Sequence, residues 1–227
     1  NYWFGSGTPT FLIEMMRKFK IVPTEIGEKS MRSSGFDAPA EKLTSIYPLL
    51  YQSGYLTIKD YNSISKLYTL DMPNQEIRIG LMESLLPNYA SKETVDGQTT
   101  ISQMCEHIIC DRLDEALKLF KAYLLTVPQC DNTNYEGHYQ QLLYVLFSLL
   151  GYEVDVEVRT DKGRIDIVMK TDYAIYLMEV KINKTAVRAR KQIDTKRYGD
   201  RFALEKRPII KVGINFSTDK HTLTGWV

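Results

Sequence analysis

The chain has 227 residues, of which 44% are hydrophobic and 25% charged, and its formal net charge is +1. This composition is ordinary for a globular protein of one or two domains, and so balanced a charge neither indicates nor excludes a nucleic-acid partner. Three cysteines are too few for a disulfide framework and indicate reduced thiols in a cytoplasmic protein. The longest apolar run, residues 142–150, is too short to span a membrane, and the N-terminal residues lack a secretory signal pattern.

Two local patterns are rejected as functional motifs. The stretch GSGTPT at 5–10 lacks the Gly-Lys-Ser/Thr ending of a phosphate-binding loop, whose lysine and hydroxyl contact phosphate and magnesium. Cys105, His107 and Cys110 are spaced by two and three residues, which fits no zinc pattern and indicates ordinary helix positions.

The first 92 residues predict a small, mostly helical domain with one hairpin. Thr8 and Pro9 are typical of a helix start, and residues 23–41 are expected to be an irregular connection. A helix is predicted from residue 43 to Gly54, strands at 55–59 and 66–70, and a second helix from Pro73 to about residue 87. This order is winged-helix-like. Without a basic recognition helix, we expect the unit to pack against a neighbour in preference to binding DNA.

The polar residues 88–98 predict a domain boundary, followed by a helical linker or cap over 93–130. Its two amphipathic helices are expected at 100–109 and 111–126.

Residues 163–181 predict a β-hairpin. Residues 163–170 alternate, with Ile165, Ile167 and Met169 on one face and Asp166 on the other, and residues 174–181 alternate as well. If Asp172 and Tyr173 form the turn, paired residue numbers sum to 345, which sets Asp166 opposite Glu179.

The same register places Lys181 on the face of these two acids. Like charges directly opposite each other repel, and a divalent cation removes that repulsion because hard cations prefer carboxylate oxygens. The hairpin therefore predicts a metal site.

At these residues the chain resembles the PD-(D/E)XK nuclease superfamily. The matching positions are Asp166 followed by Glu179-Val180-Lys181, placed on strand, turn and strand. The resemblance implies a restriction-endonuclease-like α/β fold for residues 131–227. Its αβββαβ core is expected at 136–150, 153–159, 163–170, 174–181, 185–198 and 208–215, with an edge strand at 222–227.

The resemblance also implies the roles of the site residues. Asp166, Glu179 and the Val180 carbonyl would hold Mg²⁺ or Mn²⁺, and Lys181 would orient the nucleophile or offset developing charge. Gln192, in a Q-I-x-x-K-x-Y arrangement that ends at Tyr198, would orient water or phosphate. Glu136 would contribute a further acid, or would simply favour the helix N-terminus.

Positive charge is concentrated beside these acids. Residues 181–197 carry seven Lys or Arg against one acid, whereas 131–227 as a whole carries 16 against 13. A phosphate backbone would be attracted to this segment, although charge runs are also common on solvated helix faces. The predicted nucleic-acid-binding residues are Lys184, Arg188, Arg190, Lys191 and Lys196.

The N-terminal part resembles the C-terminal part of a bacterial AAA-ATPase-like family. The similar stretches are NYWFGSGTPTFLIEMM, LLYQSGYLTI and YTLDMPNQEIRIGLMESLLP. In that family the ATPase-like region precedes a PD-(D/E)XK domain. The resemblance implies that the phosphate-binding loop lies upstream and is absent from this chain.

Together these patterns predict metal-dependent hydrolysis of nucleic acid, with DNA as the expected substrate. The alternative is an inactive nuclease-fold module that binds nucleic acid or protein, and a small-molecule hydrolase would need an apolar pocket. The sequence sets neither the strandedness nor the sequence preference of a substrate.

Overall fold

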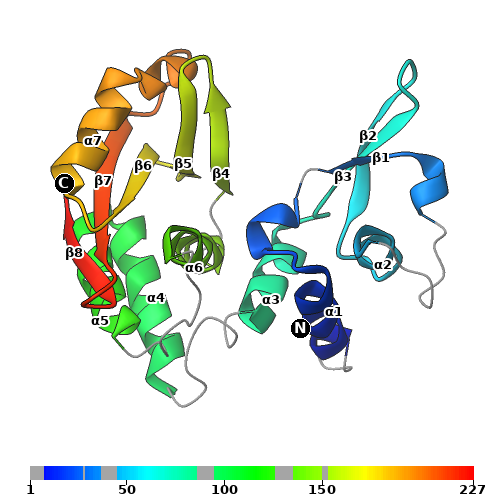
Figure 1. Ribbon diagram of the computed structural model, residues 1–227, viewed down its shortest axis with the longest axis horizontal. Coiled ribbons are helices and arrows are strands. Elements are labelled where there is room, and N and C mark those ends of the chain that lie inside the picture. The colour runs from blue at the N-terminus through cyan, green and yellow to red at the C-terminus, as the bar shows by residue number, and fades with distance from the viewer. Residues whose placement is uncertain (1–7, 28, 37–44, 86–94, 126–134, 150–152) are drawn as a thin grey trace. The chain divides into compact units, whose positions relative to one another are not determined.

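The computed structural model describes residues 8–27, 29–36, 45–85, 95–125, 135–149 and 153–227. The chain divides into two compact units, Asn1–Leu85 and Leu86–Val227, which are coloured blue to blue-green and green to red in Figure 1. Among the described residues, no helix is both long and apolar enough to cross a bilayer.

Among its described residues, the first unit combines three α-helices with a small antiparallel sheet. The sheet has the strand order β1-β3-β2, and α1 packs against α3. Its elements are α1 (Thr8–Phe19), η2 (Pro23–Glu25), β1 (Lys29–Met31), η3 (Ser33–Gly35), α2 (Tyr47–Gln52), β2 (Thr57–Asn62), β3 (Leu67–Asp71) and α3 (Gln75–Leu85).

The predicted hairpin and helices of this unit are present, with three corrections. The helix expected from residue 43 to Gly54 is shorter in the described residues, where α2 begins at Tyr47 and ends at Gln52. The segment 23–41 was expected to be irregular, but it contains β1, which pairs Lys29 with Leu70 of β3. Three residues are too few to show a periodic pattern, so β1 is identified as a strand only by its pairing with β3. Helix α3 begins at Gln75 and not at Pro73, because the side chain of Asn74 accepts a hydrogen bond from the Ile77 N–H at 2.9 Å.

The second unit contains the predicted αβββαβ core. The core is formed by α6, β4, β5, β6, α7 and β7 in that order. All elements of the unit are α4 (Val95–Ile109), α5 (Leu113–Leu124), α6 (Tyr135–Leu149), β4 (Glu153–Thr160), β5 (Gly163–Lys170), β6 (Ile175–Ile182), α7 (Ala186–Thr195), η6 (Tyr198–Phe202), β7 (Ile209–Ser217) and β8 (Thr222–Trp226).

A five-stranded mixed sheet in the order β4-β5-β6-β7-β8 organises this unit. Strands β6 and β7 are parallel, and the other neighbours are antiparallel. Parallel strands need a crossover connection, and α7 supplies it. The mixed α/β fold agrees with the predicted restriction-endonuclease-like class.

Helices cover both faces of the sheet (Figure 1). On one face, Leu177 and Val168 pack with Ile193 of α7. On the other face, the Tyr176 hydroxyl donates to Asp111, between α4 and α5, at 2.6 Å. β6 is therefore the central strand, and its first six residues are buried.

The predicted helix 185–198 ends early, at Thr195. Arg197 takes a left-handed conformation with φ 51°, and the chain continues as the short 3₁₀ helix η6. This bend separates Tyr198 from the axis of α7 and lets its ring enter the core between α7 and the sheet. Helix α4 also differs from prediction, since it begins at Val95 instead of residue 100.

Candidate active site on the β5–β6 hairpin

The pairing of β5 with β6 brings Asp166 beside Glu179. The ladder runs from Lys170↔Ile175 to Ile167↔Met178, so paired numbers sum to 345, as the alternation predicted. Backbone pairing ends there, one step before the two acids. In its place the Val180 N–H donates to Oδ2 of Asp166 at 2.8 Å. The aspartate side chain thus takes over the hydrogen bond that a partner strand would otherwise supply.

The alternation of β5 is broken at Asp166, which corrects the sequence prediction. Ile165 was expected to share a face with Ile167, but it packs in the same cluster as Val168. Opposite Asp166 on β4, Glu157 has φ 53°, an unusual value for a residue other than glycine. Such conformations concentrate at functional sites, because surrounding structure must hold them in place. The irregularity coincides with the point where the Asp166 side chain accepts the hydrogen bond from the Val180 N–H.

Glu179 is the centre of the site. Glu179 is only 1% exposed, and its Oε1 accepts hydrogen bonds from Lys181 Nζ at 2.7 Å and from Gln192 Nε2. A buried carboxylate is stable only when charge and hydrogen bonds compensate its lost hydration. The Lys181 side chain is itself 14% exposed, so both charges are held away from bulk water.

Gln192 reaches Glu179 because α7 lies unusually close to the sheet. A Cβ placed on Gly213 of β7 would lie 2.1 Å from the Ala186 carbonyl oxygen and 2.4 Å from the Arg190 nitrogen. Gly213 is also the partner of Glu179 in the β6–β7 register. The missing side chain thus lets the helix backbone rest on the strand directly beside Glu179.

Tyr198 lies against the same group of residues from η6. The residue is 2% exposed, and its hydroxyl oxygen lies 2.8 Å from the position that a Cβ on Gly163 would take. Burial raises the pKa of Tyr198, and hydrogen bonding with the Gln192 side chain and the Arg164 backbone opposes that rise, while the carboxylates of Glu179 and Asp166 add to it.

Sequence reasoning noted Tyr198 without a role and missed Gly163 and Gly213. A signal for Gly213 existed, since it is the single glycine in the apolar strand IIKVGINF, and glycine inside a strand often marks a close backbone approach. No comparable signal marks Gly163, because glycine is ordinary after a turn.

Asp166, Glu179 and Val180 offer oxygen donors of the kind that Mg²⁺ and Mn²⁺ prefer. The part of the chain that the structure describes holds no group of three or more His, Cys, Asp or Glu suited to a metal. Glu136 lies in the first turn of α6, but its side chain is outside the described residues. The described residues thus offer two carboxylates and one backbone carbonyl as metal ligands. Such a set fits an ion that keeps several water ligands.

The predicted basic residues divide into two groups. Lys184, Arg188, Lys191 and Lys196 are exposed, whereas Arg190 is half-buried, with its Nε 3.8 Å from Oδ2 of Asp194 in the next turn. The exposed group is available to a phosphate backbone. Arg190 contributes to the packing of α7.

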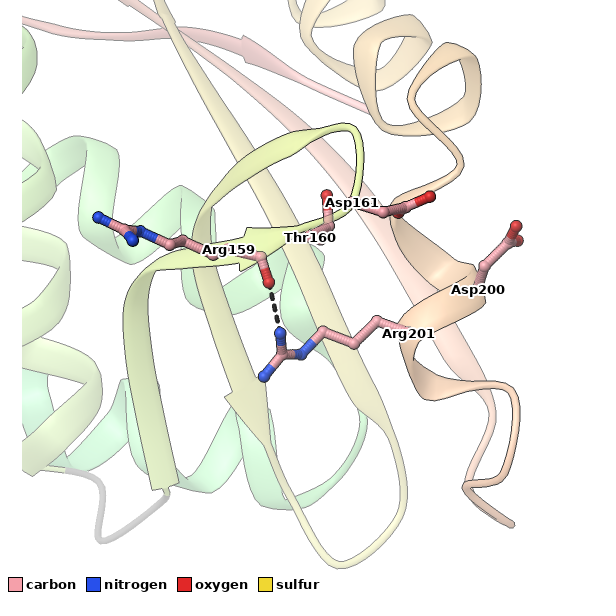
Figure 2. Close-up of a pocket in the computed structure, with 5 residues that line it drawn as sticks. All are labelled: Arg159, Thr160, Asp161, Asp200 and Arg201. Carbon is pink, nitrogen blue, oxygen red and sulfur yellow. Dashed lines mark hydrogen bonds between the residues drawn. The ribbon is translucent and has the colours of Figure 1, made fainter. Parts of the chain in front are cut away.

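An open hollow of about 500 Å³ lies between the β4–β5 turn and η6. Figure 2 shows that the Arg201 guanidinium points back to the Arg159 carbonyl, to which it donates a hydrogen bond. None of the predicted site residues lines this hollow. Its lining residues are Arg159, Thr160, Asp161, Asp200 and Arg201.

Residues 134–226 match the family model of the PD-(D/E)XK nuclease superfamily. The matched segment includes the complete group of Asp166, Glu179, Lys181 and Gln192. A domain of this superfamily therefore occupies the second unit from α6 to β8, as the resemblance implied, and it indicates a nuclease-type function.

Over its whole length the chain is 29% identical to an uncharacterized protein from the vnfD 5′ region of Azotobacter chroococcum mcd 1. The chain spans 45% of the length of that relative. No solved structure matches the chain.

Proposed function

We propose that the chain is a metal-dependent nuclease that hydrolyses phosphodiester bonds in nucleic acid, and in DNA particularly. One observation carries the proposal: Lys181 and Gln192 both donate to the buried Glu179 inside a segment that matches a nuclease superfamily. Asp166 lies next to this group through its bond to the Val180 N–H.

The ion is proposed to bind Asp166, Glu179 and the Val180 carbonyl. Two donors already occupy Oε1 of Glu179, so Oε2 is the atom we expect to face the ion. Glu136 is proposed as a further acid, bound directly or through water. When bound, Mg²⁺ or Mn²⁺ supplies Lewis acidity toward a phosphoryl oxygen and makes a water more acidic.

Lys181 and Gln192 would act on the reacting groups from fixed positions. An ammonium held in a water-poor site stabilises negative charge that develops on phosphoryl oxygens, and Lys181 meets that condition. The Gln192 amide has a second N–H and a carbonyl oxygen beyond its bond to Glu179. It can therefore orient the attacking water or a phosphate oxygen.

The exposed cations of α7 and the segment before it would bind the phosphate backbone. Lys184, Arg188, Lys191 and Lys196 are exposed and come directly after the strand that carries Glu179 and Lys181. Cations near the site increase the local concentration of a polyanionic substrate.

The attachment of this domain to an AAA-ATPase-like region stays a proposal as well. It is supported by the N-terminal stretches quoted above and by the greater length of the Azotobacter relative.

The test is a cleavage assay on plasmid and on labelled single- and double-stranded oligonucleotides, with Mg²⁺, Mn²⁺ or EDTA. Asp166→Asn and Glu179→Gln are compared with Asp172→Asn, which removes an exposed carboxylate from the turn of the same hairpin. We expect metal-dependent cleavage that falls at least about 100-fold in the two site variants and is unchanged in the control.

The competing function is a nuclease-fold module that binds nucleic acid without cutting it. It predicts metal-independent binding by the wild type and no cleavage under any condition. If Asp166→Asn cleaved at the wild-type rate, the chain would be a nuclease but the proposed site would be wrong.

A further inference from the structure

We propose that Asn215 of β7 is a positioning residue for substrate binding. Its buried amide fixes the three-residue connection between β6 and α7, residues 183–185, and thereby holds Lys184 in place for contact with a nucleic-acid phosphate. This inference rests on the proposed function. It adds a residue from β7, a strand that carries none of the proposed site residues.

Asn215 lies beside the proposed site on the same face of the sheet. The parallel register pairs it with Lys181, and pairs Gly213 with Glu179. Because side chains alternate between the two faces of a strand, Asn215 shares with Gly213 the face on which α7 rests. Asn215 is only 6% exposed, so its amide needs hydrogen-bond partners within the protein.

The amide of Asn215 bonds to the connection on one side and to β8 on the other. Its Oδ1 accepts a hydrogen bond from the Lys184 N–H at 2.9 Å. Its Nδ2 donates to Oγ1 of Thr224 at 2.7 Å, and the Thr224 hydroxyl donates to the Asn215 carbonyl oxygen at 3.3 Å. One buried side chain thus ties the backbone of Lys184 to two strands of the sheet.

The other two residues of the connection are held as well. Asn183 has φ 53°, a left-handed conformation in which asparagine is enriched, and its N–H donates to the Phe216 carbonyl at 2.8 Å. Its side chain exchanges two hydrogen bonds with Thr218, at 2.7 and 3.0 Å. Thr185 caps α7 by accepting from the Arg188 N–H at 3.1 Å. Each residue of the connection therefore has a defined position.

A defined backbone position increases what an exposed cation contributes to binding. Lys184 is exposed and follows Lys181 by three residues. A contact that is already in place when the substrate arrives loses less conformational freedom on binding. Without the Asn215 amide, the Lys184 N–H has lost its acceptor and the exposed connection is released from the sheet. Asn215 therefore controls the contribution of Lys184 to phosphate binding.

The first experiment is a double-mutant cycle of Asn215→Ala and Lys184→Met. Binding of a labelled DNA duplex is measured over a range of salt concentrations, with EDTA present so that cleavage does not interfere. Lys184→Met should reduce the slope of log binding constant against log salt concentration by about 0.9. Asn215→Ala should reduce it similarly, although it removes no charge. The double variant should match Lys184→Met, because both changes act on one contact.

The matched control is Thr222→Val, which removes a different buried hydrogen bond from β8. The Thr222 hydroxyl donates to the Lys121 carbonyl at 2.9 Å, and Thr222 is 5% exposed. Thr222→Val and Asn215→Ala should both lower the melting temperature, but only Asn215→Ala should change the salt slope. A wild-type slope in folded Asn215→Ala, or a double variant that loses the sum of both single effects, would overturn the positioning role.

The second experiment tests the hydrogen bond in the wild type and needs no variant to fold. The Lys184 amide hydrogen should exchange with D₂O at least about fivefold more slowly than in an unstructured peptide of the same sequence. Exchange at the peptide rate would refute the bond to Asn215.

Failure of this inference and failure of the proposed function give different results. Cleavage by the wild type together with additive effects of Asn215→Ala and Lys184→Met would refute the positioning role alone. A coupled cycle in a protein that never cleaves would refute the nuclease and leave the positioning role in a module that binds nucleic acid. A wild type that binds no DNA would refute the positioning role.

Discussion

Replacing Gly213 by alanine tests how the close approach of α7 builds the site. The added Cβ would lie 2.1 Å from the Ala186 carbonyl oxygen, whereas real Cβ contacts are essentially never below 3.0 Å. The helix backbone must therefore retreat by at least 0.9 Å, the difference between these distances. The atoms that the new Cβ would meet belong to the helix backbone, so rotation of a side chain cannot relieve the conflict.

This retreat has two measurable consequences. Overpacking of this kind costs about 1–3 kcal/mol, which for a protein of this size lowers the melting temperature by about 2–12 °C. Gln192 moves away from Glu179 with the helix, and a misplacement of about 1 Å can cost on the order of 100-fold in rate. Both effects should appear together in Gly213→Ala.

The assays are thermal unfolding followed by circular dichroism, and cleavage of labelled DNA at a temperature where both proteins are folded. Gly225→Ala is the matched control, because its Cβ would lie 4.0 Å from Ala186 Cβ, an ordinary contact on the neighbouring strand. If Gly213→Ala were as stable and as active as Gly225→Ala, the argument from close approach would be refuted.

Two further predictions concern charge and pH. Arg188→Met and Lys191→Met should each reduce the slope of log binding constant against log salt concentration by about 0.9 for duplex DNA. The control Lys206→Met, at another exposed lysine, should leave the slope unchanged. Equal slopes in all three variants would exclude α7 from the interface. Burial raises the pKa of Tyr123 to about 12, so the folded state retains a proton there that the unfolded state loses near pH 10. Stability from this group is complete below pH 10 and is lost as the pH rises toward 12. Tyr123→Phe should flatten that alkaline decline in thermal unfolding, and an unchanged pH profile would contradict the assignment.

The sequence by itself determined the hairpin and its register. Alternation along the two strands and a short turn at Asp172 and Tyr173 are local properties, and they fix which residues face each other. The observed pairs from Lys170↔Ile175 to Ile167↔Met178 follow that register. The approach of Asp166 to Glu179 was therefore predictable without a structure.

Sequence patterns also gave the order of the core elements, because each is long enough to show its own period. They did not give β1, whose three residues carry no period, nor the end of α7 at Thr195, where one left-handed residue redirects the chain. They also missed the break in alternation at Asp166, because the hydrogen bond from the Val180 N–H replaces regular pairing there.

Only the tertiary structure decided what surrounds Glu179. Gly213 is 34 residues beyond it in the chain, and its importance arises from the distance between a helix backbone and a strand. The contact of Tyr198 also depends on packing, since its hydroxyl meets Gly163 only when η6 packs on β5. Periodicity describes how apolar and polar residues recur along one element. The separation between two packed elements depends on the shapes of both, which no single segment of sequence contains.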